Sequence, residues 1–257
     1  MVSVVLLGYG NVGQHLHWAL QDAAGVSVQQ IYSRSYIETL NTPQTQNIST
    51  IEAADVYIIA VPDDVIGAFS QKLTFEDRLV VHTSGGAHIN VLANKNRRGI
   101  FYPLQTFSKH TKVNFSNIPI CVEAETKTDV EILKKLGSCI SKNIVEISSS
   151  EREKLHVAAV FVNNFTNHLY TIAERITEEN NLDFNLLKPL ITETARKIET
   201  LSPLKAQTGP ARRNDTKTIE KHLKLLETSK YLELYTMLTE SIKKDSGKTT
   251  NTYGEKL

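Results

Sequence analysis

Three glycines near the amino terminus stand at a spacing that can hold phosphate groups. Residues 8–13 read Gly-Tyr-Gly-Asn-Val-Gly, a complete G-x-G-x-x-G motif that directly follows an apolar run at 2–7. In that context Gly8 makes a tight turn, Gly10 lets the backbone approach a pyrophosphate, and Gly13 lets the next helix pack on the strand. The first N–H groups of that helix, from Asn11 and Val12, would face the phosphates. The motif predicts dinucleotide binding; the alternative is a strand-to-helix turn with incidental glycines.

The residues at the end of the second predicted strand indicate which dinucleotide binds. An Asp or Glu about 20 residues past the motif would accept a hydrogen bond from the ribose 2′-OH of NAD. At this distance the chain has Ser33, Arg34 and Ser35, and the next acid is Glu38. A guanidinium with two hydroxyls suits a 2′-phosphate, because Arg donates a forked pair of charge-assisted hydrogen bonds. The sequence therefore predicts NADP (NADPH) as the cofactor, with a solvated surface arginine as the alternative.

A further loop follows the apolar run at 55–61. We expect Val61 and Pro62, at the carboxyl edge of the sheet, to pass beneath the phosphates on the nicotinamide side of the cofactor. Asp63 or Asp64 can cap the next helix, and we favour capping over a catalytic role for both.

Two more loops leave predicted strands at the same edge, where open α/β sheets bind their ligands. The first carries Thr83, Ser84 and Gly85, which we expect to contact the cofactor. The second carries Tyr102 and Gln105, which we expect to contact a substrate. Each residue alone could equally belong to an ordinary turn, but two such loops at one edge favour a site.

A polar stripe marks a long helix expected in the second half of the chain. At about 100° per residue, His156, Asn163 and Asn167 share one helix face. Asparagine is a poor helix former, so its presence here is costly unless the stripe meets something polar. We interpret the stripe as catalytic, with His156 as proton donor or acceptor. The alternative is a buried polar network or a contact with a dimer partner.

The next helix supplies another pair of candidates. Pro189 should start or kink this helix, and Glu193 and Lys197 follow at spacings of four residues. Lys197 is a candidate catalytic lysine and Glu193 a candidate substrate ligand. The two could equally form an exposed ion pair on the helix surface.

A Pro/Gly loop further on carries two adjacent arginines. Arg212 and Arg213 precede a helix that Asn214 or Asp215 would cap. An arginine on such a loop suits a carboxylate or phosphate of the substrate, although it could instead cross a dimer interface. His222 in that helix is expected to be a packed residue rather than a ligand.

These candidates need a sheet to position them, and the first half of the chain predicts one. Short apolar runs alternate with amphipathic segments, as in a mostly parallel sheet covered by helices. The predicted strands are 2–7, 26–33, 55–61, 78–83, 99–102, 118–123 and 143–148. From Glu151 onward we find only helical periodicity, in a long helix over 151–180, a second over 185–201 and one or two more through Lys243. We therefore predict a doubly wound α/β domain at 1–150 and an all-α domain at 151–257, with a flexible tail at 245–257.

Composition excludes several classes of protein. The net charge of +1 gives no electrostatic case for a nucleic-acid or anionic-membrane partner. No run approaches the ~18 apolar residues of a membrane span. Cys121 and Cys139 match no metal or redox spacing and indicate buried apolar residues in a reducing cytoplasm. We expect no metal site, and no serine stands in a G-x-S-x-G elbow.

As a set, these motifs resemble a known family. The segments that carry the resemblance are "GYGNVG", "AVPDD", "HTSG", "YPLQTF", "LHVAAVFVNNFTNHL", "PLITET" and "QTGPARRND" with a following His. The chain resembles bacterial Rossmann-like NADP-binding oxidoreductases whose helical second half is a domain of unknown function. These are similar to pyrroline-5-carboxylate reductases, prephenate dehydrogenases and 6-phosphogluconate dehydrogenases. The resemblance implies a Rossmann domain, a helical dimerisation domain of the 6-phosphogluconate dehydrogenase type, and a cleft between them.

The chain departs from the family at one position: many relatives read Arg-Gly-Asp where this chain has Arg213-Asn214-Asp215. This leaves open which of Arg212 and Arg213 takes the role of the family arginine.

The leading hypothesis is a cytoplasmic, homodimeric NADP-dependent oxidoreductase. It would transfer a hydride to or from a small, anionic carbonyl or imine substrate while a side chain moves the proton. The alternative is a non-catalytic NADP-binding or sensing protein that kept the fold without the chemistry, since a fold alone does not separate the two.

Overall fold

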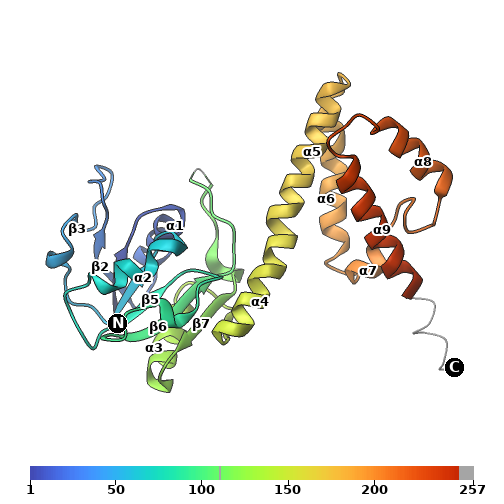
Figure 1. Ribbon diagram of the computed structural model, residues 1–257. Coiled ribbons are helices and arrows are strands. Elements are labelled where there is room, and N and C mark those ends of the chain that lie inside the picture. Colours follow the sequence, from blue (N-terminus) through green and yellow to red (C-terminus); the bar gives the residue numbers. More distant parts are fainter. Residues whose placement is uncertain (110, 249–257) are drawn as a thin grey trace. The chain divides into compact units, whose positions relative to one another are not determined.

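The computed structural model describes residues 1–109 and 111–248, and its first half is built around one sheet of eight strands (Figure 1). The strand order is β3-β2-β1-β4-β5-β6-β7-β8. All neighbouring strands are parallel except β6 and β7. The strands are Val2–Leu7 (β1), Val26–Tyr32 (β2), Gln44–Thr45 (β3), Val56–Ile59 (β4), Leu79–His82 (β5), Arg97–Pro103 (β6), Ile120–Ala124 (β7) and Ile144–Glu146 (β8). The predicted mostly parallel sheet is confirmed, and only the two-residue β3 has no counterpart among the predicted strands.

In this half, α-helices lie between β1 and β2, between β4 and β5, and between β7 and β8. The helices of the described chain are Asn11–Gln21 (α1), Ile66–Gln71 (α2), Lys127–Ser138 (α3), Ser149–Ala159 (α4), Thr166–Glu179 (α5), Lys188–Lys197 (α6), Pro203–Ala206 (α7), Thr216–Leu225 (α8) and Leu232–Lys248 (α9). The strand order reverses direction between β1 and β4. In open α/β sheets the ligand crevice lies at such a point, outside the carboxyl ends of the strands.

Both faces of the central strands are covered, which explains their almost continuous apolar sequences. Val4 and Leu6 of β1 belong to a hydrophobic cluster that also contains residues of α1 and α3. Val5 and Leu7 point to the opposite face, where Ile66 of α2 lies in the second cluster. The alternation of side chains along β1 therefore places helices on both faces of the sheet.

The helix α4 packs on the sheet through β6. Phe101 of β6 lies in the first cluster, so Ile100 and Tyr102 point to the other face. There Leu155 of α4 packs against them. A capping box in which Ser148 and Glu151 bond reciprocally fixes the start of this helix. The docking of α4 brings the next residue, His156, to the carboxyl end of β6.

The long helix predicted over 151–180 is helical throughout but not uniform. Val160–Phe165 form a π-helix between α4 and α5. A π-helix bonds each residue to the fifth one along rather than the fourth, so it shifts the phase of everything that follows. The spacing of about 100° per residue assumed for the polar stripe is therefore wrong across this segment.

The chain divides into two compact units, one ending at Phe165 and one beginning at Thr166. The predicted all-helical second half is confirmed, while the domain boundary near residue 150 stays a prediction. The helix α9 continues to Lys248 and so includes the first residues of the predicted flexible tail. The remainder of that tail, 249–257, lies outside the described residues.

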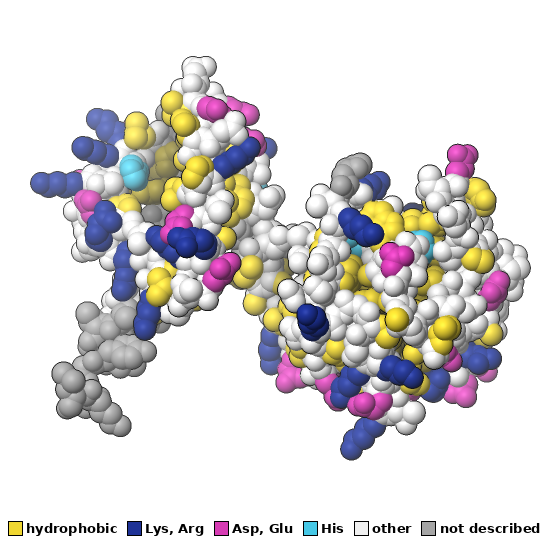
Figure 2. Space-filling view, turned by 180° about the vertical axis from the view of Figure 1, so that it is seen from behind, with side chains coloured by type: hydrophobic (Ala, Val, Ile, Leu, Met, Phe, Trp, Pro, Cys, Tyr) yellow, Lys and Arg dark blue, Asp and Glu magenta, His cyan; other side chains and the backbone are white. Residues whose placement is uncertain are grey.

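The second unit exposes much apolar surface. Among its described residues, the buried apolar side chains are Ile172, Ala211, Ile219 and Tyr231. Its exposed large apolar side chains are Leu169, Ile176, Leu182, Leu186, Leu190, Ile198, Leu201, Leu204, Leu225, Met237 and Leu238. Figure 2 shows hydrophobic side chains on one face of the protein. No helix within the described chain combines the length and the apolar character that crossing a membrane requires.

Candidate functional site

The glycine-rich turn joins β1 to α1 and has the geometry that its motif requires. Gly8 has a φ of +113°, in the left-handed region that favours glycine. A Cβ on Gly8 would lie 2.5 Å from the Ala60 carbonyl oxygen, and one on Gly13 would overlap the Gly8 carbonyl oxygen. A Cβ on Gly10, by contrast, would meet nothing within 4 Å. Two of the glycines are therefore required by packing, and the middle one borders open space.

This open space lies at the start of α1, where a phosphate fits. Gly10 is the N-cap of α1, so no capping side chain occupies the helix end, and the first turn holds no acidic residue. The N–H groups of Asn11 and Val12 belong to the first turn, whose N–H groups have no partner within a helix. The helix dipole favours an anion at this helix end. The residues present fit a dinucleotide pyrophosphate.

Arg34 lies close to the glycine-rich turn because the two loops share a hydrogen bond. The Gly8 N–H donates to the carbonyl of Tyr32, the last residue of β2, at 2.9 Å. In the loop that follows, the Ser33 hydroxyl donates to the Ser35 carbonyl oxygen at 2.8 Å. Arg34 between them is exposed and forms no ion pair within the described part of the chain. Its guanidinium is available for a phosphate beside the turn.

A buried histidine, which the sequence analysis does not single out, connects these two loops. His17 on α1 is 3% exposed, and its ring nitrogens lie 3.1 Å from the Tyr9 hydroxyl and 2.8 Å from the Thr42 hydroxyl. Burial lowers the pKa of His17 and raises the pKa of Tyr9. Tyr9 is the second residue of the glycine motif, and Thr42 lies in the loop after β2. The network therefore holds the Arg34 loop in a defined position.

The loop after β4 contacts the loop after β5 through one hydrogen bond. The Ser84 hydroxyl donates to Asp63 Oδ2 at 2.6 Å and accepts the N–H groups of Gly86 and Ala87 at 3.1 and 2.9 Å. A hydroxyl has one donor and two acceptor sites, so all of Ser84's capacity is used here. The expected capping role of Asp63 or Asp64 is wrong, because Pro62 occupies the N-cap and no side chain caps this turn.

The neighbouring cofactor candidates surround this contact. Val61 Cγ1 would lie 3.0 Å from a Cβ on Gly8, which places Val61 and Pro62 next to the glycine-rich turn. The Thr83 N–H and hydroxyl both donate to the Ile59 carbonyl oxygen, at 3.2 and 3.4 Å. Thr83 and Ser84 therefore shape the loop with their side chains, and contact between them and a cofactor stays a prediction.

The ends of β5 and β6 meet α4 at His156. The Tyr102 hydroxyl lies 3.3 Å from His156 Nδ1. A Cβ on Gly85 would overlap His156 Nδ1 and lie 2.8 Å from Tyr102 Cζ, so only glycine allows the two rings to approach. Burial raises the pKa of Tyr102 to about 12, which keeps its hydroxyl protonated near neutral pH. The structure thus brings together three residues predicted from separate segments.

A buried arginine, also absent from the sequence-based candidates, anchors α4. Arg152 is fully buried, and its Nη1 donates to Glu123 Oε2 of β7 at 2.8 Å. Its Nη2 donates to the Ala87 carbonyl oxygen in the loop after β5. The Ser149 hydroxyl on the same helix donates to Glu123 at 2.7 Å and accepts the Ile89 N–H at 3.0 Å. These bonds fix α4, and with it His156, against that loop.

The cation of Arg152 also affects a second histidine. His82, the last residue of β5, is fully buried, and its Nδ1 accepts the Ser84 N–H at 3.2 Å. Burial, and then the positive charge of Arg152, lower the pKa of His82 to about 4. His82 is therefore uncharged near neutral pH, and its hydrogen bond with Ser84 supports the loop after β5.

Gln105, Asn163 and Asn167 are not drawn into this cluster. Gln105 is exposed, and its side-chain oxygen accepts the N–H of Thr106 at 2.8 Å. Asn163, in the π-helix, and Asn167, in α5, are both exposed. Because π-helices inside longer helices are frequent at functional sites, this irregular segment keeps the asparagines as candidates.

The candidates on α6 have different partners from those expected. Pro189 stands in the first turn of α6 and starts the helix. Glu193 pairs with Arg196 at 2.7 Å, so the alternative of an ion pair between Glu193 and Lys197 is not found among the described residues. The reason is that Arg196 reaches the same carboxylate from three residues away. Lys197 is half-buried and forms no ion pair within the described residues.

The two loop arginines precede α8, as predicted. Asp215 caps this helix by accepting the Thr218 N–H at 3.1 Å. Asn214 has a φ of +54°, a conformation that Asn tolerates and Gly adopts freely, which accounts for the change from the family's glycine. Arg212 and Arg213 form no ion pair within the described chain. His222 packs against α9, with its Nδ1 2.8 Å from the Tyr235 hydroxyl.

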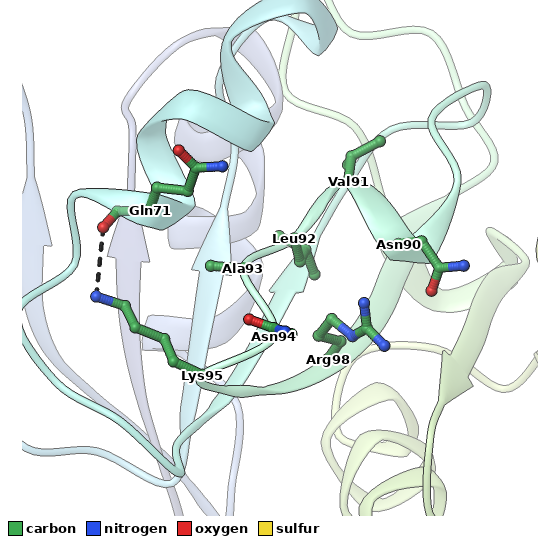
Figure 3. A pocket seen from close by; sticks show the side chains of 8 residues that line it. All are labelled: Gln71, Asn90, Val91, Leu92, Ala93, Asn94, Lys95 and Arg98. Carbon is green, nitrogen blue, oxygen red and sulfur yellow. Dashed lines mark hydrogen bonds between the residues drawn. The ribbon is translucent and has the colours of Figure 1, made fainter.

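A separate surface hollow of about 480 Å³ lies near the start of β6 (Figure 3). It is lined by Gln71, Asn90, Val91, Leu92, Ala93, Asn94, Lys95 and Arg98. The Lys95 ammonium donates to the Gln71 and Leu73 carbonyl oxygens, and the Arg98 guanidinium binds Glu125. Its cations are thus already paired, and it lies at the edge opposite the glycine-rich turn. Within the described residues, no group of three or more His, Cys, Asp or Glu side chains could hold a metal ion.

Comparison with known proteins relates this arrangement to solved structures. A candidate NADP oxidoreductase from Bacteroides fragilis is 36% identical, with a TM-score of 0.86 over 95% of this chain and 98% of that one. A protein from Thermotoga maritima is 21% identical, with a TM-score of 0.76 over 96% and 100% of the two chains. A pyrroline carboxylate reductase from Plasmodium falciparum, solved with NADP bound, is 13% identical, with a TM-score of 0.62 over 95% and 97%.

The last two likenesses concern the fold alone, whereas the first extends to the sequence. No curated protein sequence matches the chain. The domain of unknown function DUF2520 matches residues 118–242, which include α4, the π-helix and most of the second unit. The chain belongs to the family of the Bacteroides fragilis protein, the Rossmann-fold NADP oxidoreductases.

Proposed function

We propose that this protein is an NADP-dependent oxidoreductase that transfers a hydride to or from a small carbonyl or imine substrate. The observation that supports this most is the clustering at one edge of the sheet. The open space over Gly10, the unpaired Arg34 and the Tyr102–His156 pair all follow the carboxyl ends of parallel strands. Phosphate-binding and proton-moving groups are thus present on the same side of one rigid scaffold.

NADP would be held chiefly by backbone groups. The N–H groups of Asn11 and Val12 would bind the pyrophosphate, and Arg34 with Ser33 and Ser35 would bind the 2′-phosphate. Val61, Pro62 and the loop Thr83–Gly85 would border the nicotinamide half. When bound, the nicotinamide supplies or accepts the hydride at its C4.

The proton that accompanies the hydride needs a side chain, and His156 is our candidate. Its ring lies against Gly85 and the Tyr102 hydroxyl, and an imidazole exchanges protons near neutral pH. Asn163, Asn167 and Lys197 remain candidates for the same reaction.

An anionic group on the substrate would need a cation outside this cluster. The Arg152 guanidinium is fully buried and paired with Glu123, so it is not available to a ligand. Arg212 and Arg213 stay our candidates for binding that anion, and Tyr102, Gln105 and Glu193 stay our candidates for other substrate contacts.

The test is a binding and turnover assay on the full chain. We expect NADPH to bind in isothermal titration calorimetry, and a metabolite mixture to oxidise it. The His156→Gln variant should no longer turn over any substrate that the wild type turns over, while it should still bind NADPH. Binding of NADPH without consumption by any carbonyl or imine compound would instead support the non-catalytic sensing protein.

We also propose that the second unit forms a homodimer. Leu186, Leu190 and Ile198, spaced at multiples of four residues on and beside α6, are 72%, 62% and 52% exposed. A monomer rarely leaves such a row of large apolar side chains in water. A second copy of the chain can cover the same row through a two-fold axis, because each copy presents the same surface. A cytoplasmic location stays a prediction.

Light scattering at micromolar concentration tests this assembly. We expect twice the mass of the 28.8 kDa chain, and the mass of a monomer for Leu190→Glu, which would place a charge in the interface. Val91→Glu, an equivalent change at a half-exposed residue of the first unit, should leave the dimer intact. A monomeric wild type would contradict the proposal.

A further inference from the structure

The contact between Tyr102 and His156 also affects which ring nitrogen of His156 carries the proton. A neutral imidazole carries one proton, on either Nδ1 or Nε2, and the hydrogen bond made by one nitrogen decides which. The Tyr102 hydroxyl lies 3.3 Å from Nδ1. The direction of this bond therefore sets which nitrogen of His156 holds the proton.

The Tyr102 hydroxyl is the donor in this bond. Its side chain lies on the buried face of β6, in a cluster with Ile100 and Cys121, and Tyr102 is 9% exposed. This environment, through burial first and the thiol of Cys121 next, favours the neutral phenol, and it raises the pKa of Tyr102 to about 12. Among the described residues the Tyr102 hydroxyl has no other hydrogen-bond partner, so His156 Nδ1 is the acceptor that its proton can reach. A bond in the other direction would leave this buried O–H proton without an acceptor, so Nδ1 accepts.

The surroundings hold the ring of His156 in the orientation that this bond requires. The Nδ1 edge lies against Gly85, and Cδ2 would lie 3.6 Å from a Cβ on Gly86. The backbone of α4 cannot turn away, because Arg152 and Ser149 bond it to the strand β7 and to the loop after β5.

The opposite nitrogen of the ring has no such partner. Among the described residues, Nε2 of His156 makes no hydrogen bond, and the side chain is partly exposed. It is therefore the nitrogen that a ligand or water can reach.

We infer that Tyr102 is a positioning residue that fixes the tautomer of His156, so that Nε2 carries the proton that the site exchanges with its substrate. The inference deepens the proposed function and rests on it in one respect, namely that the site has a substrate. The tautomer itself is a property of the free protein. In a reduction, the Nε2–H bond breaks as the new O–H or N–H bond of the product forms. A neutral imidazole does not give up its one proton near neutral pH unless the other nitrogen gains one, so the Tyr102 O–H proton moves to Nδ1 in the same step. Water then returns a proton to the Tyr102 oxygen. The hydride for that step comes from the nicotinamide of NADPH.

Nitrogen NMR of the full chain, labelled with ¹⁵N-histidine, tests this directly. The two ring nitrogens of a neutral histidine have separate shifts that identify the protonated one, and His156→Gln assigns the signals. We expect the wild type at neutral to mildly alkaline pH to show the Nε2–H form. In Tyr102→Phe the ratio of the two tautomers should fall by roughly fivefold to tenfold, the size expected when one hydrogen bond is removed.

The chain offers a matched control in another tyrosine–histidine pair, which lies in the second unit. Tyr235→Phe removes the same kind of bond from His222, whose Nδ1 lies 2.8 Å from that hydroxyl. It should change the His222 signals and leave those of His156 as they are. If Tyr102→Phe fails to fold, the wild-type spectrum alone decides, because a dominant Nδ1–H form of His156 would overturn the inference. An unchanged ratio in a folded Tyr102→Phe would overturn it too.

Calorimetry with NADPH separates this inference from the proposed function. Tyr102→Phe should bind NADPH as the wild type does, since it keeps the ring and removes only the hydroxyl, whose hydrogen bond is to His156. A wild type that binds no NADPH would contradict the proposed function without altering the tautomer result.

Discussion

Replacing Arg34 with alanine is expected to abolish most of the preference of this protein for NADPH over NADH. In the wild type we expect NADPH to bind about ten- to a hundredfold more tightly, because a hydrogen bond to a charged group contributes about 1.5–3 kcal/mol. The Arg34 guanidinium is exposed, unpaired within the described chain, and two residues past the strand end, Tyr32, that bonds to Gly8. NADH lacks the 2′-phosphate, so its affinity should change little.

Calorimetric titration of both cofactors measures this ratio. Arg78→Ala is the matched control, because Arg78 is also exposed but precedes β5 at the opposite edge of the sheet. Its ratio should equal that of the wild type. The wild-type preference should also decline with added salt, since an exposed ion pair is screened. Equal affinity of the wild type for NADPH and NADH would contradict the assignment of Arg34.

Substitutions of two glycines in the turn should separate an effect on stability from an effect on cofactor binding. Gly13→Ala is expected to lower the free energy of unfolding by about 3 kcal/mol, because its Cβ would overlap the backbone oxygen of Gly8 and the turn would have to shift. Gly10→Ala meets nothing within 4 Å and has an ordinary φ of −75°, so its stability should match the wild type. Its methyl group would nevertheless occupy the space of the pyrophosphate, and NADPH affinity should fall at least about tenfold, as for a lost charge-assisted bond.

Urea unfolding and calorimetry on the two variants complete the comparison. A Gly13→Ala protein as stable as the wild type would mean that helix and turn do not pack as described. A Gly10→Ala protein that binds NADPH normally would mean that the phosphates lie elsewhere.

The elements that carry the site could be predicted because their signals are local. The G-x-G-x-x-G motif, the apolar strands and the polar Ser33–Ser35 loop each lie within a few residues, and the periodicity of side chains locates them. The carboxyl-edge rule then brings Gly85 and Tyr102 into one region without any knowledge of contacts.

The remaining parts of the site depend on long-range or subtle contacts. In the sequence, Arg152 resembles an ordinary charged helix residue. Its ion pair with Glu123 of β7 is found only in the structure. Similarly, the Ser84 hydroxyl looks free for a ligand until Asp63 and two backbone N–H groups use all of its capacity.

The π-helix at Val160–Phe165 shows a different limit. Its sequence, Val-Phe-Val-Asn-Asn-Phe, holds no signal that separates a π-helix from an α-helix, and only the backbone hydrogen bonds reveal the change of phase. A helical face drawn through His156 and Asn167 therefore cannot be derived from sequence spacing alone.

The most direct test of the central claim is a crystal structure of the full chain soaked with NADPH. The account predicts the pyrophosphate on the N–H groups of Asn11 and Val12, the 2′-phosphate on Arg34, and the nicotinamide beside the Tyr102–His156 pair, with Nε2 of His156 facing the substrate space. A nicotinamide far from the His156 ring, with that ring bonded only to protein groups, would contradict the account.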